Sequence, residues 1–409
     1  MLAQQTLAPC PRRIPHDLRR SAVRNLEQAG VPRSVAMKLT GHKTESVYRR
    51  YSIADDRDLR VAVERLDAVA ASWRRLPRTQ GETIGAYQKL SVSRYASTPM
   101  INSLADKLLS RKSGICLYGF APPKQATPMD QLEAIVAQHV VRLGSLPVDG
   151  LIIYDIQDET ERISTERPFP FLPTLSPEAY AHQHLASLTV PKIVYRCVNR
   201  DTATEFVQWL GSVSPPRLSV LVGAPSNRSH AGLSLMDAYG LVRQHTPDLL
   251  LGGIAIAERH ARRLDEHERL LAKTEQGCRF FVTQAVYDVA STKSLLSDYA
   301  LAVRSKGAVP LPIILTFSPC GSQKTLAFMK WLGIAFPRCL ENELRLAADP
   351  LAKSVELCER IFAEVWEYAR DKDIPLGVNV ESVSIRKTEI EASVELLQLL
   401  RQRIDSSGR

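Results

Sequence analysis

From residue 114 to the C-terminus, short apolar runs rich in β-branched residues alternate with longer segments whose apolar positions recur at helical spacing. Each run has the length of one strand, and each periodic segment has the length of a helix. Strands that read as continuous apolar runs are typical of a parallel sheet covered on both faces. The strand-like runs are 114–120, 148–156, 191–198, 218–224, 249–257, 278–287, 310–317 and 374–383. The helical segments are 128–142, 178–188, 202–212, 233–245, 261–276, 291–305, 322–333 and 351–370.

This alternation predicts an α/β fold, namely a (β/α)8 TIM-like barrel over residues 100–409. Before it, four short segments with helical periodicity predict a small all-α segment over residues 1–76. Residues 77–99 are polar, rich in Ser and Thr and without a period, which is typical of a linker. In (β/α)8 barrels the active site lies at the C-terminal ends of the strands, so polar residues at those ends are the candidates for function.

Composition narrows the class of protein. The chain has 409 residues, 44% of them apolar, and no apolar run approaches the roughly 18 residues that a membrane-spanning helix needs. The N-terminus lacks the basic start and long apolar core of a signal peptide. Seven scattered cysteines without a C-x-x-C pair indicate reduced thiols and argue against a zinc site. We therefore expect a cytoplasmic protein without a membrane partner or a metal, whose oligomeric state the sequence leaves open.

The net charge of +9 is concentrated at one end of the chain. Residues 1–80 contain 16 Lys and Arg against 8 Asp and Glu, whereas the remainder is close to neutral. A cationic segment of this kind is typical of a polyanion-binding region or of a solvated tail. We expect weak, salt-sensitive binding of duplex DNA through residues 1–80.

The basic segment also carries a motif. His16 and Arg19 stand in an H-x-x-R pattern, and His42 in a Gly-His pair precedes Tyr51 by nine residues. This arrangement resembles the catalytic end of the tyrosine recombinase, or phage integrase, family. The resemblance implies that Tyr51 attacks a DNA phosphate while the other three residues stabilise charge and move protons. The family needs a further arginine and a lysine-bearing hairpin before this motif, and only 15 residues precede His16. We expect an inactive remnant; the alternative is a DNA-binding integrase fragment.

The barrel region has a second resemblance. "RLLAKTEQGCRFFVTQAVYD" (269–288), "YGFAPPK" (118–124) and "PLPIILTFSPCGSQKTLAFMKWLGIAFP" (310–337) are similar to motifs of the methylenetetrahydrofolate reductase family. The resemblance implies reduction of 5,10-methylenetetrahydrofolate, with FAD carrying hydride from NADH or NADPH. It places Gln284 against the pterin ring, since a carboxamide donates and accepts at once.

At several positions where this family contacts the flavin, the residues of this chain differ from those of the family. By the resemblance, Lys273 and Glu266 are retained in a cofactor-binding role, and His260 stands in the segment that replaces a Tyr-Pro pair beside the flavin. The family's Arg and Asp positions at the flavin are Val222 and Ala224 here. These replacements predict weak FAD binding. A flavin-independent barrel that binds folate or transfers a methyl group is therefore an alternative.

The family's first-strand proton donor is also missing, because its position is Gly119. The segment "YDIQDETER" (154–162) places carboxylates at the end of the second strand, and clustered carboxylates raise one another's pKa. We expect Asp155, Asp158 and Glu159 to supply a replacement acid, with Asp155 facing the barrel interior and Ile153 facing outward. An ordinary solvated loop is the alternative interpretation.

The end of the eighth strand, with Glu381, Ser382 and Arg386, has the position of the phosphate site found in many barrels. We expect Arg386 to bind a phosphate or the carboxylates of a folate tail.

Overall fold

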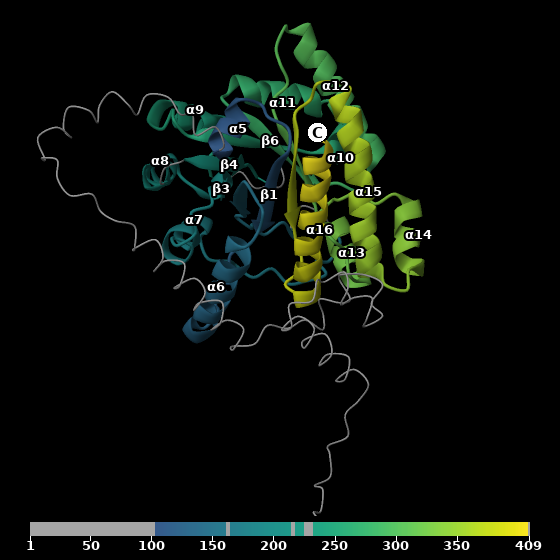
Figure 1. Ribbon diagram of the computed structural model, residues 1–409. Coiled ribbons are helices and arrows are strands. Elements are labelled where there is room, and N and C mark those ends of the chain that lie inside the picture. The colour runs from purple at the N-terminus through teal and green to yellow at the C-terminus, as the bar shows by residue number, and fades with distance from the viewer. Residues whose placement is uncertain (1–102, 161–163, 214–216, 225–231, 408–409) are drawn as a thin grey trace, which may run out of the picture. The chain divides into compact units, whose positions relative to one another are not determined.

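The computed structural model describes residues 103–160, 164–213, 217–224 and 232–407 (Figure 1). The chain divides into two units, Met1–Ser97 and Thr98–Arg409, and all described residues belong to the second unit. The segment expected to resemble a recombinase, including His16, Arg19, His42 and Tyr51, lies outside the described residues. Its structure and role stay predictions.

Strands β1 to β8 pair in sequence order, all in parallel, and β8 pairs with β1 to close the barrel. The predicted (β/α)8 barrel is therefore confirmed. Each strand falls within one of the predicted apolar runs. The strands are β1 Ile115–Phe120, β2 Gly150–Ile153, β3 Lys192–Cys197, β4 Leu218–Val222, β5 Leu250–Ala255, β6 Phe280–Ala285, β7 Ile313–Phe317 and β8 Leu376–Glu381.

Helices pack around the barrel, and the side chains at their first positions often cap them (Figure 1). Thr202, for example, forms a capping box with Glu205 at the start of α8. None of the described helices is long and apolar enough to cross a membrane. The helices are α5 Leu104–Leu109, α6 Met129–Gly144, α7 Pro177–Ala179, η2 Tyr180–His184, η3 Val198–Arg200, α8 Ala203–Ser212, α9 Leu235–His245, α10 Ala257–Arg263, α11 Glu266–Glu275, α12 Val289–Ser305, α13 Gln323–Trp331, α14 Arg338–Leu346, α15 Pro350–Arg370 and α16 Lys387–Ser407.

The helix layer differs from the sequence prediction at several places, and helices α14 and α16 were not among the predicted segments. The segment expected to be one helix over 261–276 is two, because the chain breaks at Leu264, whose φ of 56° is left-handed. Helix α5 was not predicted, and its Leu104 and Leu108 are buried with the side chains that fill the barrel interior.

Alternation along the strands sorts side chains between the barrel interior and the helix layer. Leu117 and Ile152 belong to the interior cluster, whereas Tyr118 and Ile153 belong to the cluster shared with the helices. The same alternation places Gly119, Tyr154 and Glu381 on the inner side, at or just beyond the C-terminal ends of their strands. This mouth of the barrel is where the fold allows a site.

Candidate functional site

Gly119 leaves a gap at the mouth that a neighbouring strand fills. A Cβ atom at Gly119 would lie 2.7 Å from the hydroxyl oxygen of Tyr154 and 2.8 Å from a carbon of its ring. The Tyr154 ring also packs edge-on against Tyr195 of β3, with ring centroids 4.9 Å apart. The absence of a side chain at Gly119 therefore makes room for the Tyr154 phenol inside the barrel.

Glu381 lies at the end of β8, in register with Gly119 on β1. This register places Glu381 beside the first-strand position at which the resemblance expected a carboxylate. Burial raises the pKa of Glu381 to about 7, and the hydrogen bond from the Tyr154 hydroxyl lowers it only in part. The residue as a whole is half-buried, at the C-terminal end of β8. A carboxyl that changes protonation near neutral pH is suited to general acid or base catalysis.

The hydroxyl of Tyr154 is held by a buried amide beneath it. Nδ2 of Asn379 donates to the Tyr154 hydroxyl over 2.8 Å and to Oγ1 of Thr316 over 3.3 Å. The phenol thus accepts a hydrogen bond from below and donates one to Glu381. Burial raises the pKa of Tyr154 well above its ordinary value, so the phenol keeps its proton. The sequence analysis did not single out Tyr154 or Asn379.

Gln284 lies near the end of β6, where its Nε2 donates to the carbonyl oxygen of Leu332 over 2.7 Å. This contact holds the carboxamide at the strand end. Its role against a pterin ring stays a prediction.

An aromatic wall stands beside Leu332. The loop after β2 brings the guanidinium of Arg167 to 5.3 Å from the ring centroid of Phe328 and 4.9 Å from that of Trp331. Nε1 of Trp331 in turn donates to the carbonyl of Thr165 over 2.9 Å. Nε of Arg167 is buried without a hydrogen-bond partner in the structure, and burial lowers the pKa of this side chain. Arg167 is therefore a candidate for binding an anionic group, which the sequence analysis missed.

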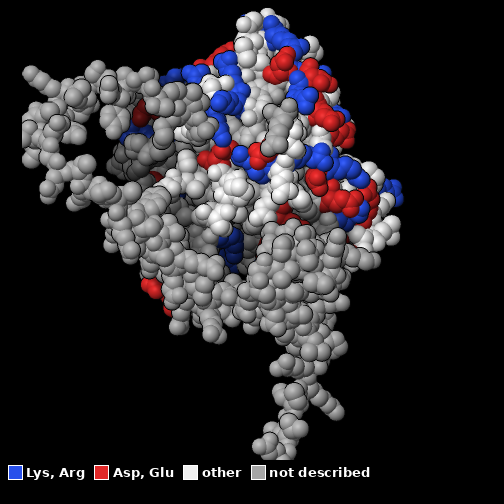
Figure 2. Space-filling view, viewed as in Figure 1, with Lys and Arg blue, Asp and Glu red and all other residues white. Residues whose placement is uncertain are grey.

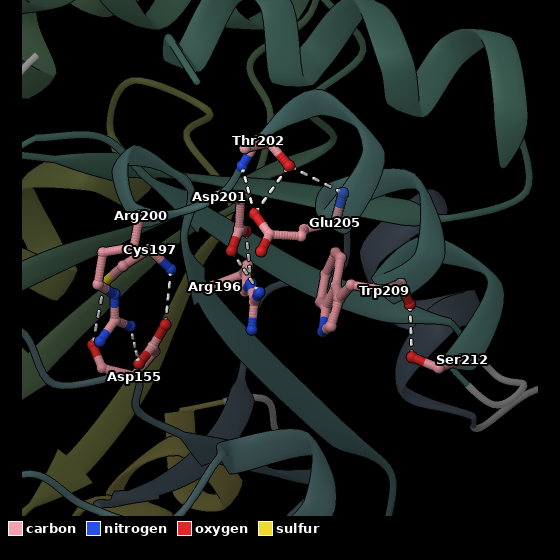
Figure 3. A network of polar contacts seen from close by, with 9 residues as sticks. All are labelled: Asp155, Arg196, Cys197, Arg200, Asp201, Thr202, Glu205, Trp209 and Ser212. Atoms are coloured by element: carbon pink, nitrogen blue, oxygen red, sulfur yellow. Dashed lines mark hydrogen bonds and ion pairs between the residues drawn. The ribbon is translucent and has the colours of Figure 1, made fainter. Parts of the chain in front are cut away.

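Asp155 does not face the barrel interior, so that expectation was wrong (Figure 3). Its carboxylate accepts the backbone N–H of Cys197 over 2.8 Å and pairs with Arg200. The reason is elementary: residues two apart on a strand share a face, so Asp155 follows Ile153 away from the interior while Tyr154 points inward.

In the loop after β2, the pKa of Asp158 is lowered and not raised. Hydrogen bonds from the hydroxyl and the backbone N–H of Thr160 lower the pKa of Asp158, the reverse of the expectation for that residue. Glu159 lies in the same loop and interacts electrostatically with Arg167. The side chain of Arg386 is exposed just before α16. The catalytic and anion-binding roles of these residues stay predictions.

The residues expected to hold a flavin are engaged elsewhere. Lys273 donates to the carbonyl of Ile254, and its pKa is lowered mainly by burial. Glu266 accepts the N–H of Ile256 over 3.1 Å and pairs with Arg259, while His260 is fully buried against Asp298.

The two replaced positions offer a flavin no charge. Val222 packs against the apolar interior cluster, and Nε2 of Gln157 lies 3.3 Å from the carbonyl of Gly223 beside it. Together with the engaged Lys273, Glu266 and His260, this arrangement does not fit an isoalloxazine ring.

A cavity of about 450 Å³ lies outside the barrel mouth, between α10, α12 and the segment after α13. Glu258, Asp288 and Phe336 are among its lining residues, and burial raises the pKa of Glu258. Glu381 and Tyr154 are not among the residues that line this cavity.

Basic and acidic side chains are mixed over the part of the described surface that Figure 2 shows. The DNA binding expected of residues 1–80 lies outside the described residues and stays a prediction. Ion pairs such as Lys293–Glu364 and Arg403–Glu359 join neighbouring helices. All six described cysteines are free thiols, in line with the expectation for the chain.

Comparison with known proteins found no matching family model and no match among curated proteins. Among solved structures, one from Clostridium thermocellum is 44% identical, with a TM-score of 0.66 over 73% of this chain and 99% of its own. That protein binds two copies of 5-methyl-5,6,7,8-tetrahydrofolic acid. The xylanase XynB from Paenibacillus barcinonensis is 10% identical (TM-score 0.39, 70% of this chain and 88% of its own). The intracellular xylanase from Thermoanaerobacterium saccharolyticum is also 10% identical (TM-score 0.39, 69% and 91%). Because this chain is 44% identical to the Clostridium thermocellum protein and covers 99% of that protein, the chain belongs to the same family.

Proposed function

We propose that this barrel binds a reduced folate at its C-terminal mouth and exchanges a proton with a ring nitrogen of that folate through Glu381. The observation that carries the choice of ligand is the 44%-identical relative, which binds 5-methyltetrahydrofolate. The raised pKa of Glu381 supports the choice of chemistry.

A one-carbon group on the N5 nitrogen of a tetrahydrofolate leaves poorly unless that nitrogen gains a proton. A carboxyl with a pKa of about 7 holds a transferable proton at neutral pH, whereas an ordinary glutamate does not. The Tyr154 hydroxyl stabilises the carboxylate that remains after the proton has left. Glu381 is therefore the proposed proton donor, in place of Asp155, Asp158 and Glu159.

Two further groups are proposed to orient the ligand. The carboxamide of Gln284 would pair with the pterin edge, and Arg167 would meet the anionic tail with its unpartnered Nε. Arg167 has the advantage over Arg386 that three aromatic rings hold its guanidinium.

A reductase of methylenetetrahydrofolate with FAD and NADH or NADPH is the second candidate. The Thr283–Gln284 pair at the end of β6 favours it, because the resemblance rests partly on that strand. The engaged or apolar residues at the flavin positions disfavour it. We therefore propose first that the barrel binds folate, or transfers a methyl group, without a flavin.

The folate proposal predicts that Gln284→Ala weakens binding of 5-methyltetrahydrofolate by about 5-fold to 150-fold. This range corresponds to the loss of about 1–3 kcal/mol of hydrogen bonding. Isothermal titration calorimetry on the full chain measures the affinity, and Gln208→Ala, on the exposed side of α8, is the matched control. A wild-type protein that binds no folate would refute the proposal, and an unchanged affinity in Gln284→Ala would remove Gln284 from it.

The poor fit to a flavin predicts that the purified protein lacks visible flavin absorbance and gains none after incubation with FAD and desalting. Each charged hydrogen-bonding partner lost at the ring removes about 1.5–3 kcal/mol. Absorbance spectra before and after denaturation measure bound flavin. A yellow preparation with one FAD per chain would favour the reductase.

A further inference from the structure

Three metal-ligating side chains meet in the helix layer, away from the barrel mouth. His260 of α10, His267 of α11 and Asp298 of α12 each offer a donor atom, and these atoms lie within 4.8 Å of one another. The two imidazole rings are perpendicular, with centroids 5.4 Å apart. Nε2 of His260 lies 3.1 Å from Oδ2 of Asp298.

The two histidines carry hydrogen-bonding capacity that the described residues do not use. Nδ1 of His260 and Nδ1 of His267 are both buried without a partner, and the side chain of His260 is fully buried. Buried polar atoms are nearly always satisfied by protein, water or an ion, because leaving them unpaired costs free energy. Two imidazoles with unused nitrogens and one carboxylate, whose possible donor atoms lie within 4.8 Å of one another, indicate a missing ligand that accepts electron pairs.

We propose that His260, His267 and Asp298 bind a divalent d-block cation such as Zn²⁺. Two imidazoles and one carboxylate are a ligand set that zinc accepts in proteins, with water in the remaining position. Tetrahedral zinc ligands lie about 3.3–3.5 Å apart, as bond lengths of about 2.0–2.2 Å require. Small rotations of the half-buried His267 and Asp298 therefore close the site. The Asp298 side chain is 42% exposed, which gives the ion a path of entry.

The position of the site suggests what the ion does. His260 and His267 lie on either side of the break between α10 and α11, where Leu264 adopts its left-handed conformation. A non-glycine residue in this conformation is strained, and it persists only if its surroundings hold it. An ion that joins both sides of the break to α12 fixes the angle between the two helices. Glu266, which holds the end of β5 through Ile256, starts the second of them.

Titration of the chelator-stripped full chain with Zn²⁺ tests this site. The wild-type chain is expected to bind one equivalent more than His267→Ala, and its Tm is expected to rise with added Zn²⁺. Removing one ligand is expected to weaken the affinity for this Zn²⁺ ion by at least 10-fold to 100-fold. That range is the usual loss when a group that only supports a metal ligand is removed. His182→Ala, an exposed histidine on η2, controls for adventitious binding.

Asp298→Asn is a second, milder variant that keeps the shape of the side chain. It decides the question if His267→Ala fails to fold. The proposal is overturned if the folding-competent variants bind as many equivalents as tightly as the wild type. It is also overturned if Zn²⁺ leaves the Tm of the wild-type chain unchanged.

Discussion

Replacing Glu381 with glutamine is expected to stabilise the protein above about pH 7 relative to the wild type, by about 1–3 kcal/mol. The folded chain raises the pKa of Glu381 from 4.5 to about 7. Below pH 4.5 the carboxyl is protonated in both the folded and the unfolded chain, so it does not lower the free energy of unfolding. Between the two values the folded state holds a proton that the unfolded state has released, so stability falls as pH rises. A pKa shift of this size corresponds to a loss of at most about 3 kcal/mol in the free energy of unfolding. The partial exposure of Glu381 makes the expected loss smaller.

Urea unfolding at about pH 5 and about pH 8 measures this difference. Glutamine cannot ionise, so the stability advantage of the variant should grow between the two pH values. Glu395→Gln, an exposed position on α16, controls for the loss of one carboxyl. The same Glu381 variant should lower any turnover that needs the proton by about 10²–10⁴-fold. A stability difference that is independent of pH would mean that Glu381 titrates like an ordinary glutamate, and the proposed donor would fall with it.

The barrel was predictable because its strands are buried on both faces. Runs such as 114–120 and 310–317 are almost entirely apolar, and β1 and β7 lie inside them. The break at Leu264 was not predictable by the same means, since neither Gly nor Pro marks it. Helix α5 has only six residues, too few for a clear period.

The candidate site was predictable only in its position. The sequence indicated polar residues at the strand ends, including Glu381, but gave Glu381 no role and expected Arg386 near it to bind an anion. Its raised pKa comes from burial between strands that are far apart in the chain, with Gly119 in register and the Tyr154 hydroxyl as hydrogen-bond donor. The gap at Gly119 was a usable signal: a strand-end glycine facing inward leaves room for a large side chain from the adjacent strand. Sequence alone does not specify which strand supplies that side chain.

Gly119→Ala is expected to destabilise the protein by about 1–3 kcal/mol, the usual cost of overpacking a well-filled core. The added methyl group would lie 2.7–3.0 Å from three atoms of the Tyr154 phenol. The ring cannot simply retreat, because it packs on Tyr195 and its hydroxyl is bonded to Asn379. Gly240→Ala in α9 is the matched control, since a Cβ there meets no atom within 4 Å. That substitution should instead stabilise the helix by about 0.5–1 kcal/mol.

A double-mutant cycle shows whether the cost of Gly119→Ala arises at Tyr154. In a Tyr154→Leu background the ring and hydroxyl that oppose the new methyl group are gone, so Gly119→Ala should cost at least about 1 kcal/mol less than in the wild type. Denaturant unfolding of the four proteins gives the coupling energy. An equal cost in both backgrounds would place the clash elsewhere and would contradict the view that Gly119 exists to admit Tyr154. Because Tyr154 is also the hydrogen-bond donor to Glu381, a large coupling would connect the first-strand glycine, through Tyr154, to the proposed proton donor on the eighth strand.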